Sequence, residues 1–91
     1  TGNKDAYKSL LVEFFDDPDF AALRESLGEN NTSDAFEYAH GLKGMAANLG
    51  LDAVYQPLSK LVEILRQGSM EGAMDAYKQV CDACKVVTAL L

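Results

Sequence analysis

Apolar side chains recur along this chain at intervals of three and four residues, which is the spacing of an amphipathic helix. The sequence has no sustained alternation of apolar and polar residues and no Asn-Gly or Asp-Gly hairpin turn, so strands are not predicted. We predict five helices, over residues 4–16, 18–27, 32–49, 51–67 and 69–91. They would form one all-α domain, most simply an antiparallel four-helix bundle with a short additional N-terminal helix.

The predicted boundaries depend on residues that start or stop helices. Asp17 suits the N-cap of the second helix and Pro18 its first position, where the missing N–H of proline is not needed. Residues 31–33 are all suitable N-caps for the third helix, and Gly50 can adopt the left-handed conformation that ends it. Pro57 lies inside the fourth pattern and predicts either a bend or a later start.

The third predicted helix carries the only histidine of the chain, His40. At about 100° per residue, the apolar stripe of this helix centres near 180° from His40. The stripe consists of Ala35, Tyr38, Leu42, Met45 and Leu49, with Ala39 and Ala46 on one shoulder. His40 is therefore predicted on the face opposite the core, together with Ser33, Phe36, Lys43, Gly44 and Ala47.

Two glycines, Gly41 and Gly44, interrupt this helix, and each costs roughly 1 kcal/mol relative to alanine. The apolar stripe continues past them, so we expect an unbroken helix. Gly44 lies one turn after His40 on the same face and leaves one flank of the imidazole open. Lys43 is also a neighbour of His40, and no acidic residue three or four positions away pairs with it. An accessible, neutral imidazole beside an unpaired cation suits transient phosphorylation on nitrogen.

The residues around His40 resemble the signature of the histidine-containing phosphotransfer (HPt) domain of two-component phosphorelays. The pattern H-x-L-K-G corresponds to residues 40–44, and the small residues and N-[LI]-G that follow it correspond to residues 46–50. The resemblance implies a helical bundle that displays a phosphoacceptor histidine. Such a domain takes a phosphoryl group from a receiver-domain aspartate and passes it to another receiver.

Carried over residue by residue, the resemblance implies that His40 accepts the phosphoryl group and Lys43 stabilises it. Gly44 would give access, and Gly50 would cap the helix. Members of this family often add a polar helper from the next helix, and the sequence leaves four candidates open: Gln56, Ser59, Lys60 and Glu63.

Phe36, Gly41 and Ala47 are candidates for docking a receiver domain. Small apolar residues around one polar centre are what a transient interface needs. For Phe36 a second interpretation stays equally open, in which the ring tucks under the N-terminal helix.

The expected partners are receiver domains of response regulators or of hybrid sensor histidine kinases. The resemblance implies a monomeric carrier without turnover of its own, whether it is free-standing or part of a kinase, and a cytoplasmic location. No cofactor or metal of its own is expected, and Mg²⁺ would come with the receiver. The net charge of −6 argues against nucleic acid, and no apolar run reaches the roughly 18 residues of a membrane span, so no direct membrane contact is expected.

Other interpretations predict different behaviour. A phosphorylation-incompetent helical adaptor that only docks receiver domains would keep all its activity in a His40→Gln variant. A metal-binding or enzymatic bundle is weakly supported, because one histidine cannot supply the paired Glu-x-x-His motifs of such sites. Cys81 and Cys84 form a CxxC sequence within a predicted helix, with Cys84 on its apolar stripe. We predict that they pack rather than bind metal or exchange disulfides.

Overall fold

The structure is a computed structural model that describes the backbone of residues 2–90 and the side chains of residues 6–90. Within that range it contains five helices and no strand, which confirms the predicted all-α class. The helices are α1 (Gly2–Phe15), α2 (Pro18–Gly28), α3 (Thr32–Asn48), α4 (Asp52–Arg66) and α5 (Ala73–Ala89). None of them combines the length and apolar character needed to cross a bilayer.

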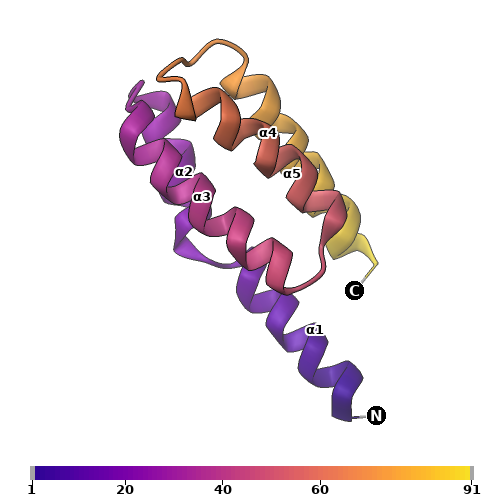
Figure 1. The fold of residues 1–91 in the computed structure, drawn as a ribbon. Coiled ribbons are helices and arrows are strands. Elements are labelled where there is room, and N and C mark those ends of the chain that lie inside the picture. Colours follow the sequence, from indigo (N-terminus) through magenta and orange to yellow (C-terminus); the bar gives the residue numbers. More distant parts are fainter. Residues whose placement is uncertain (1, 91) are drawn as a thin grey trace.

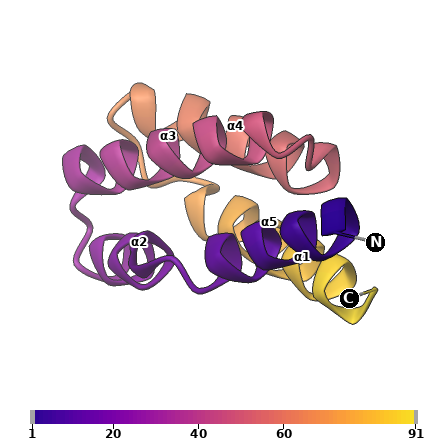
Figure 2. The same ribbon diagram turned by 90° about the horizontal axis from the view of Figure 1, so that it is seen from below.

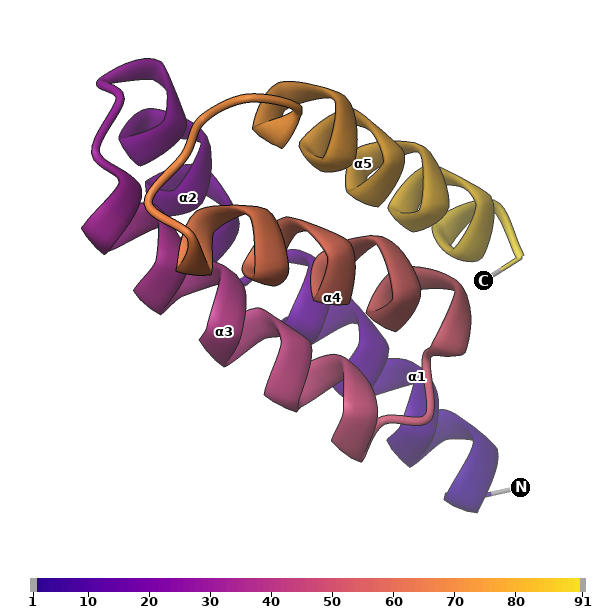
Figure 3. The ribbon, with the colours of Figure 1, turned by 45° about the horizontal axis from the view of Figure 1, so that its top comes forward.

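The helices α2 to α5 form an antiparallel bundle in which each helix packs against the next (Figure 1). Figure 2 shows α3 and α4 in one layer and α2 and α5 in the other. Figure 3 shows α4 between α3 and α5, so α3 has its outer face free of α5. The core is closed by large apolar side chains from four helices: Leu23, Leu42, Val54, Leu58, Leu61, Val62 and Val80.

The N-terminal helix is not short, since α1 has 14 residues and α2 has 11. The helix α1 lies on the same side of the bundle as α2 and extends past the end of the bundle (Figure 1). The two are separated at residues 16–17, where the Asp17 side chain accepts a hydrogen bond from the Asp19 N–H at 2.8 Å. The hydroxyl group of Tyr7 donates to the Leu49 carbonyl at 2.7 Å, which ties α1 to the end of α3.

Both ends of α3 are capped. The Asn31 side chain accepts from the Asp34 N–H at 3.0 Å and donates to the Asp34 carboxylate at 2.9 Å. At the other end Gly50 has a φ of 70°, and the N–H of Leu51 donates to the Ala46 carbonyl at 2.9 Å. This is the predicted left-handed glycine cap, and it satisfies carbonyls that the last turn would otherwise leave without partners.

One boundary, the start of the last helix, differs from the sequence prediction by more than two residues. The last helix begins at Ala73 rather than near residue 69, because Gly72 precedes it with a left-handed φ of 81°. The fourth helix begins at Asp52, five residues before Pro57. Pro57 therefore lies inside α4 and does not mark a late start. Pro57 is the sixth residue of α4, so its missing N–H leaves the Ala53 carbonyl without its usual helical partner.

Candidate functional site

The helix α3 presents His40 to solvent, but its buried face is rotated from the predicted position. The fully buried residues are Ala35, Ala39, Leu42 and Ala46. At 100° per residue they centre about 130° from His40, not near 180°. The large residues expected at the centre, Tyr38, Met45 and Leu49, are only half-buried. The three alanines end at Cβ and therefore let neighbouring helices approach closely. The sequence prediction placed the largest apolar side chains at the centre of the buried face and did not account for this effect.

The rotation brings one flank of the histidine face against α4. Lys43, on this flank, is half-buried, and its Nζ atom lies 5.6 Å from the centre of the Tyr55 ring. Among residues 6–90, no carboxylate forms an ion pair with Lys43. No carboxylate of the described side chains therefore neutralises Lys43 beside His40, while an aromatic ring restrains the ammonium group.

Phe36 lies on the same flank, one turn before His40. The Phe36 and His40 rings are stacked, with centres 5.7 Å apart and planes 26° from parallel. The Arg66 guanidinium of α4 lies 5.5 Å from the centre of the Phe36 ring, and its Nε atom lies 3.3 Å from the Glu63 carboxylate. The Phe36 ring thus lies against the last turn of α4 and does not tuck under the N-terminal helix, and its role in docking a receiver stays a prediction.

Arg66 is a neighbour of the site that the sequence analysis missed. The four α4 candidates were Gln56, Ser59, Lys60 and Glu63, and of these Glu63 forms an ion pair with Arg66. The available signal was spacing, because Tyr55 and Arg66 are eleven residues apart, about three helical turns, and therefore share a face of α4. That face lies along the histidine side of α3.

The other flank carries the two glycines. A Cβ atom added at Gly44 would have nothing within 4 Å, so no close approach inside the domain requires glycine there. A Cβ at Gly41 would lie 3.8 Å from the Asp19 carboxylate of α2. Burial, and then the nearby Asp17 carboxylate, raise the pKa of Asp19. Ala47 is exposed one turn further along, so Gly41, Gly44 and Ala47 leave little side-chain bulk beside His40.

One face of α3 therefore presents an exposed histidine, an open glycine one turn on, and a lysine that forms no ion pair with the side chains of residues 6–90. The family model for the Hpt domain matches residues 10–89. This chain belongs to the Hpt domain family. No curated protein and no solved structure matches the chain. Membership gives the domain a role in phosphotransfer within two-component signalling, where Hpt domains act as carriers and interact with receiver domains.

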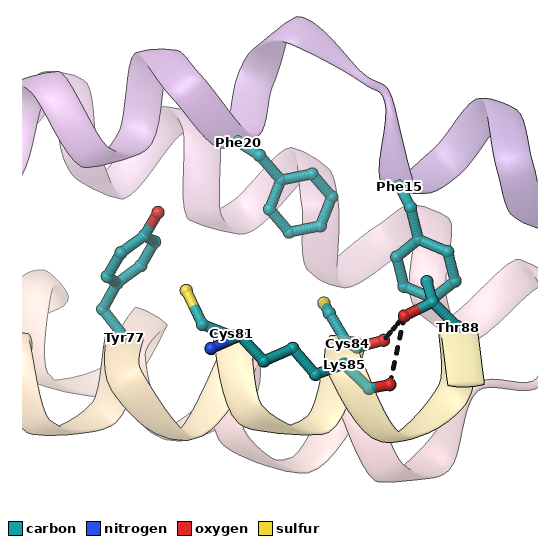
Figure 4. Close-up of a pocket in the computed structure, with 7 residues that line it drawn as sticks. All are labelled: Phe15, Phe20, Tyr77, Cys81, Cys84, Lys85 and Thr88. Atoms are coloured by element: carbon teal, nitrogen blue, oxygen red, sulfur yellow. Dashed lines mark hydrogen bonds between the residues drawn. The ribbon is translucent and has the colours of Figure 1, made fainter.

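The CxxC sequence of this Hpt domain lies away from His40, on α5. Cys81 and Cys84 face Phe15 and Phe20 across the junction of α1 and α2 (Figure 4). Together with Tyr77, Lys85 and Thr88 they line a pocket of about 270 Å³.

Neither thiol of the CxxC sequence forms a disulfide. Burial, with a smaller effect of the neighbouring Cys81, raises the pKa of Cys84 to about 11. Burial and a hydrogen bond with Cys81 raise the pKa of Tyr77 to about 12. Among the side chains of residues 6–90, no three from His, Cys, Asp or Glu gather as metal ligands would. The half-buried positions and the raised pKa of Cys84 are those of packing groups.

Proposed function

We propose that this Hpt domain is a phosphorelay intermediate in which His40 accepts a phosphoryl group from the aspartate of one receiver domain and passes it to the aspartate of another. The observation that carries the proposal is the exposed imidazole at an unobstructed surface. Gly44 leaves open space one turn after it, and Lys43 supplies an unneutralised cation one turn after it on the α4 side.

The transfer step uses these groups in separate ways. The lone pair of an imidazole nitrogen attacks phosphorus, the new N–P bond forms, and the P–O bond to the aspartyl carboxylate breaks so that the carboxylate leaves with its electrons. The transition state of such a transfer is loose, so positioning and charge stabilisation provide most of the acceleration. In our proposal the Lys43 ammonium stabilises the oxygens of the phosphoryl group. Transfer to the second receiver is the reverse reaction.

The open surface around His40 suits a transient complex. Gly41 and Ala47 add little bulk, and a receiver can approach the imidazole over them. We infer that the domain acts as a monomeric carrier without turnover of its own and needs no resident cofactor, with Mg²⁺ arriving on the receiver. We also infer a cytoplasmic location, where receiver domains of response regulators and hybrid kinases operate.

The test is phosphotransfer from a receiver domain charged on its aspartate to the wild type and to His40→Gln. We expect an acid-labile, base-stable label on the wild type and none on the variant. Glu37→Gln, an exposed change on the same helix, is the matched control and should label like the wild type. Absence of label from a panel of receivers, with all three proteins folded, would instead support an adaptor that only docks.

A further inference from the structure

The Phe36 side chain is engaged inside the domain although it lies on the histidine face. It is half-buried, its ring is stacked with that of His40, and the Arg66 guanidinium lies over the same ring at 5.5 Å. Ring centres of stacked aromatic pairs lie 4.5–7 Å apart, and cation–π contacts reach about 6 Å, so both contacts have attractive geometry. Phe36 therefore links the imidazole on α3 to a cation on α4.

Space is available for Phe36 to leave this position. A hollow of about 330 Å³ lies between the start of α3 and the end of α4, bordered by Thr32, Phe36, Leu65 and Arg66. A phenylalanine ring beside such a hollow can change rotamer without displacing the core. The contact with Arg66 opposes that movement, and the ion pair of Arg66 with Glu63 restrains the guanidinium in turn.

We propose that Phe36 is a positioning residue for His40 and that Arg66 holds Phe36 in place. The proposal rests on the proposed role of His40 as phosphoacceptor and adds how its ring is oriented. An imidazole with one face against Phe36 rotates less freely about its side-chain bonds, and its reacting nitrogen then meets a docked receiver in a productive orientation more often. Loss of such alignment lowers the rate within a complex without weakening the complex itself.

The central experiment measures single-turnover labelling by a receiver domain that labels the wild type, over a range of receiver concentrations. Phe36→Leu removes the stabilising energy of one aromatic pair. We therefore expect a maximal rate about two- to tenfold lower than that of the wild type, with the half-saturating receiver concentration unchanged. Phe36→Tyr keeps the ring and should restore the rate. Tyr38→Leu removes another half-buried aromatic of α3 and should leave the maximal rate unchanged.

Two further readouts distinguish positioning from docking and from misfolding. Phosphoramidate is a freely diffusing phosphoryl donor. The imidazole nitrogen forms a bond to its phosphorus, the bond between phosphorus and the reagent's own nitrogen breaks, and that nitrogen, once protonated, leaves as ammonia. The phosphoramidate rate with Phe36→Leu should equal that of the wild type, because a small donor needs no fixed approach. The NMR signals of the His40 ring protons should move to lower field in Phe36→Leu, as the shielding of the stacked ring is lost.

Arg66 is tested through a double-mutant cycle with Phe36. Arg66→Gln should lower the maximal rate, and adding it to Phe36→Leu should produce no further loss, because both changes remove the same restraint. Lys78→Gln removes one exposed positive charge from α5 and should have no effect on the rate. Equal effects of Arg66→Gln and Lys78→Gln would show that Arg66 acts through charge alone and would overturn its role.

The outcomes separate the two proposals. A wild type that no receiver labels contradicts the proposed function. A labelled wild type whose Phe36→Leu variant reaches the same maximal rate contradicts the positioning role alone. If only the half-saturating concentration rises, Phe36 is a docking residue, and unchanged His40 proton signals in Phe36→Leu would show that the stack does not exist in solution.

Discussion

Two regions of this Hpt domain combine aromatic rings, a hollow and a side chain capable of covalent chemistry, yet they suit opposite tasks. At the histidine face, His40 is exposed, and the cations Lys43 and Arg66 lie against rings on its α4 flank. At the junction of α1 and α2 with α5, the thiols of Cys81 and Cys84 are half-buried among Phe15, Phe20 and Tyr77 (Figure 4).

In our proposal, the environment of each side chain decides which of these nucleophiles can react. An exposed imidazole beside cations can receive a negatively charged phosphoryl group, because nearby positive charge stabilises the group as it arrives. Burial has the reverse effect on Cys84, since an apolar environment disfavours the thiolate and raises the thiol pKa to about 11. The following predictions test this contrast, from the largest expected effect to the smallest.

The largest effect should be loss of the acceptor. His40→Gln should abolish phosphoryl labelling while the free energy of unfolding changes by less than about 1.5 kcal/mol, because the residue is exposed and loses only its stack with Phe36. The double variant Cys81→Ser/Cys84→Ser should label like the wild type. Labelling assays with urea denaturation curves of each protein measure both quantities. If the cysteine variant is not labelled, the thiols are needed for phosphotransfer, and our assignment of the chemistry to the His40 region is contradicted.

Alkylation should reveal the protected state of Cys84. With a pKa raised by burial from about 9 to about 11, its thiolate fraction at pH 8 is roughly a hundredfold lower than that of an ordinary thiol. Iodoacetamide should therefore modify Cys84 at least that much more slowly in the folded protein than in urea, as measured by mass spectrometry. The Cys81→Ser variant isolates the reaction of Cys84, and equal rates in both conditions would contradict the prediction.

Removing the cation next to His40 should have a smaller effect than removing the histidine. A hydrogen bond with a charged donor contributes about 1.5–3 kcal/mol, so Lys43→Gln should slow transfer by about tenfold or more. Lys43→Arg should recover part of the rate, and Lys78→Gln on α5 serves as the charge control. Labelling time courses measure these rates, and a wild-type rate in Lys43→Gln would remove Lys43 from the site.

Gly44 should show opposite effects on stability and transfer. Alanine there meets nothing within 4 Å and removes the flexibility of glycine inside a helix, so Gly44→Ala should stabilise the fold by about 0.5–1 kcal/mol. The same methyl group narrows the approach to His40 and should slow labelling by a receiver but not by phosphoramidate. Denaturation curves and the two labelling reactions test this, and equal slowing by both donors would contradict the access role.

The pH dependence of stability should follow the buried thiol. Because burial raises the folded-state pKa of Cys84 above its ordinary value of about 9, the unfolded chain releases this proton first as the pH rises. The stabilising contribution is complete below about pH 9 and is lost as the pH rises through about 11. Urea denaturation at pH 8 and pH 10.5 should show a smaller loss of stability in Cys84→Ala than in the wild type.

Much of the fold could be predicted because its signals are local. Asp17, Asn31 and Gly50 act where they were expected, since a cap depends on side chains and backbone within one turn. The start of α5 was less predictable. Ser69 is of a residue type that often begins a helix. The loop after α4 nevertheless continues to Gly72, whose left-handed backbone precedes the first residue of α5.

The amino-acid sequence by itself determined that the chain forms a helical bundle and which helix presents His40, Lys43 and Gly44 on one face. Periodicity and spacing within a helix carry that information, because residues three and four apart are neighbours whatever the rest of the fold does. Only the tertiary structure decided that α3 turns its alanine side inward, that Tyr55 restrains Lys43, and that Phe36 joins His40 to Arg66. These contacts cross between helices, and their geometry depends on how closely small side chains allow two helices to approach, which no spacing along one helix specifies.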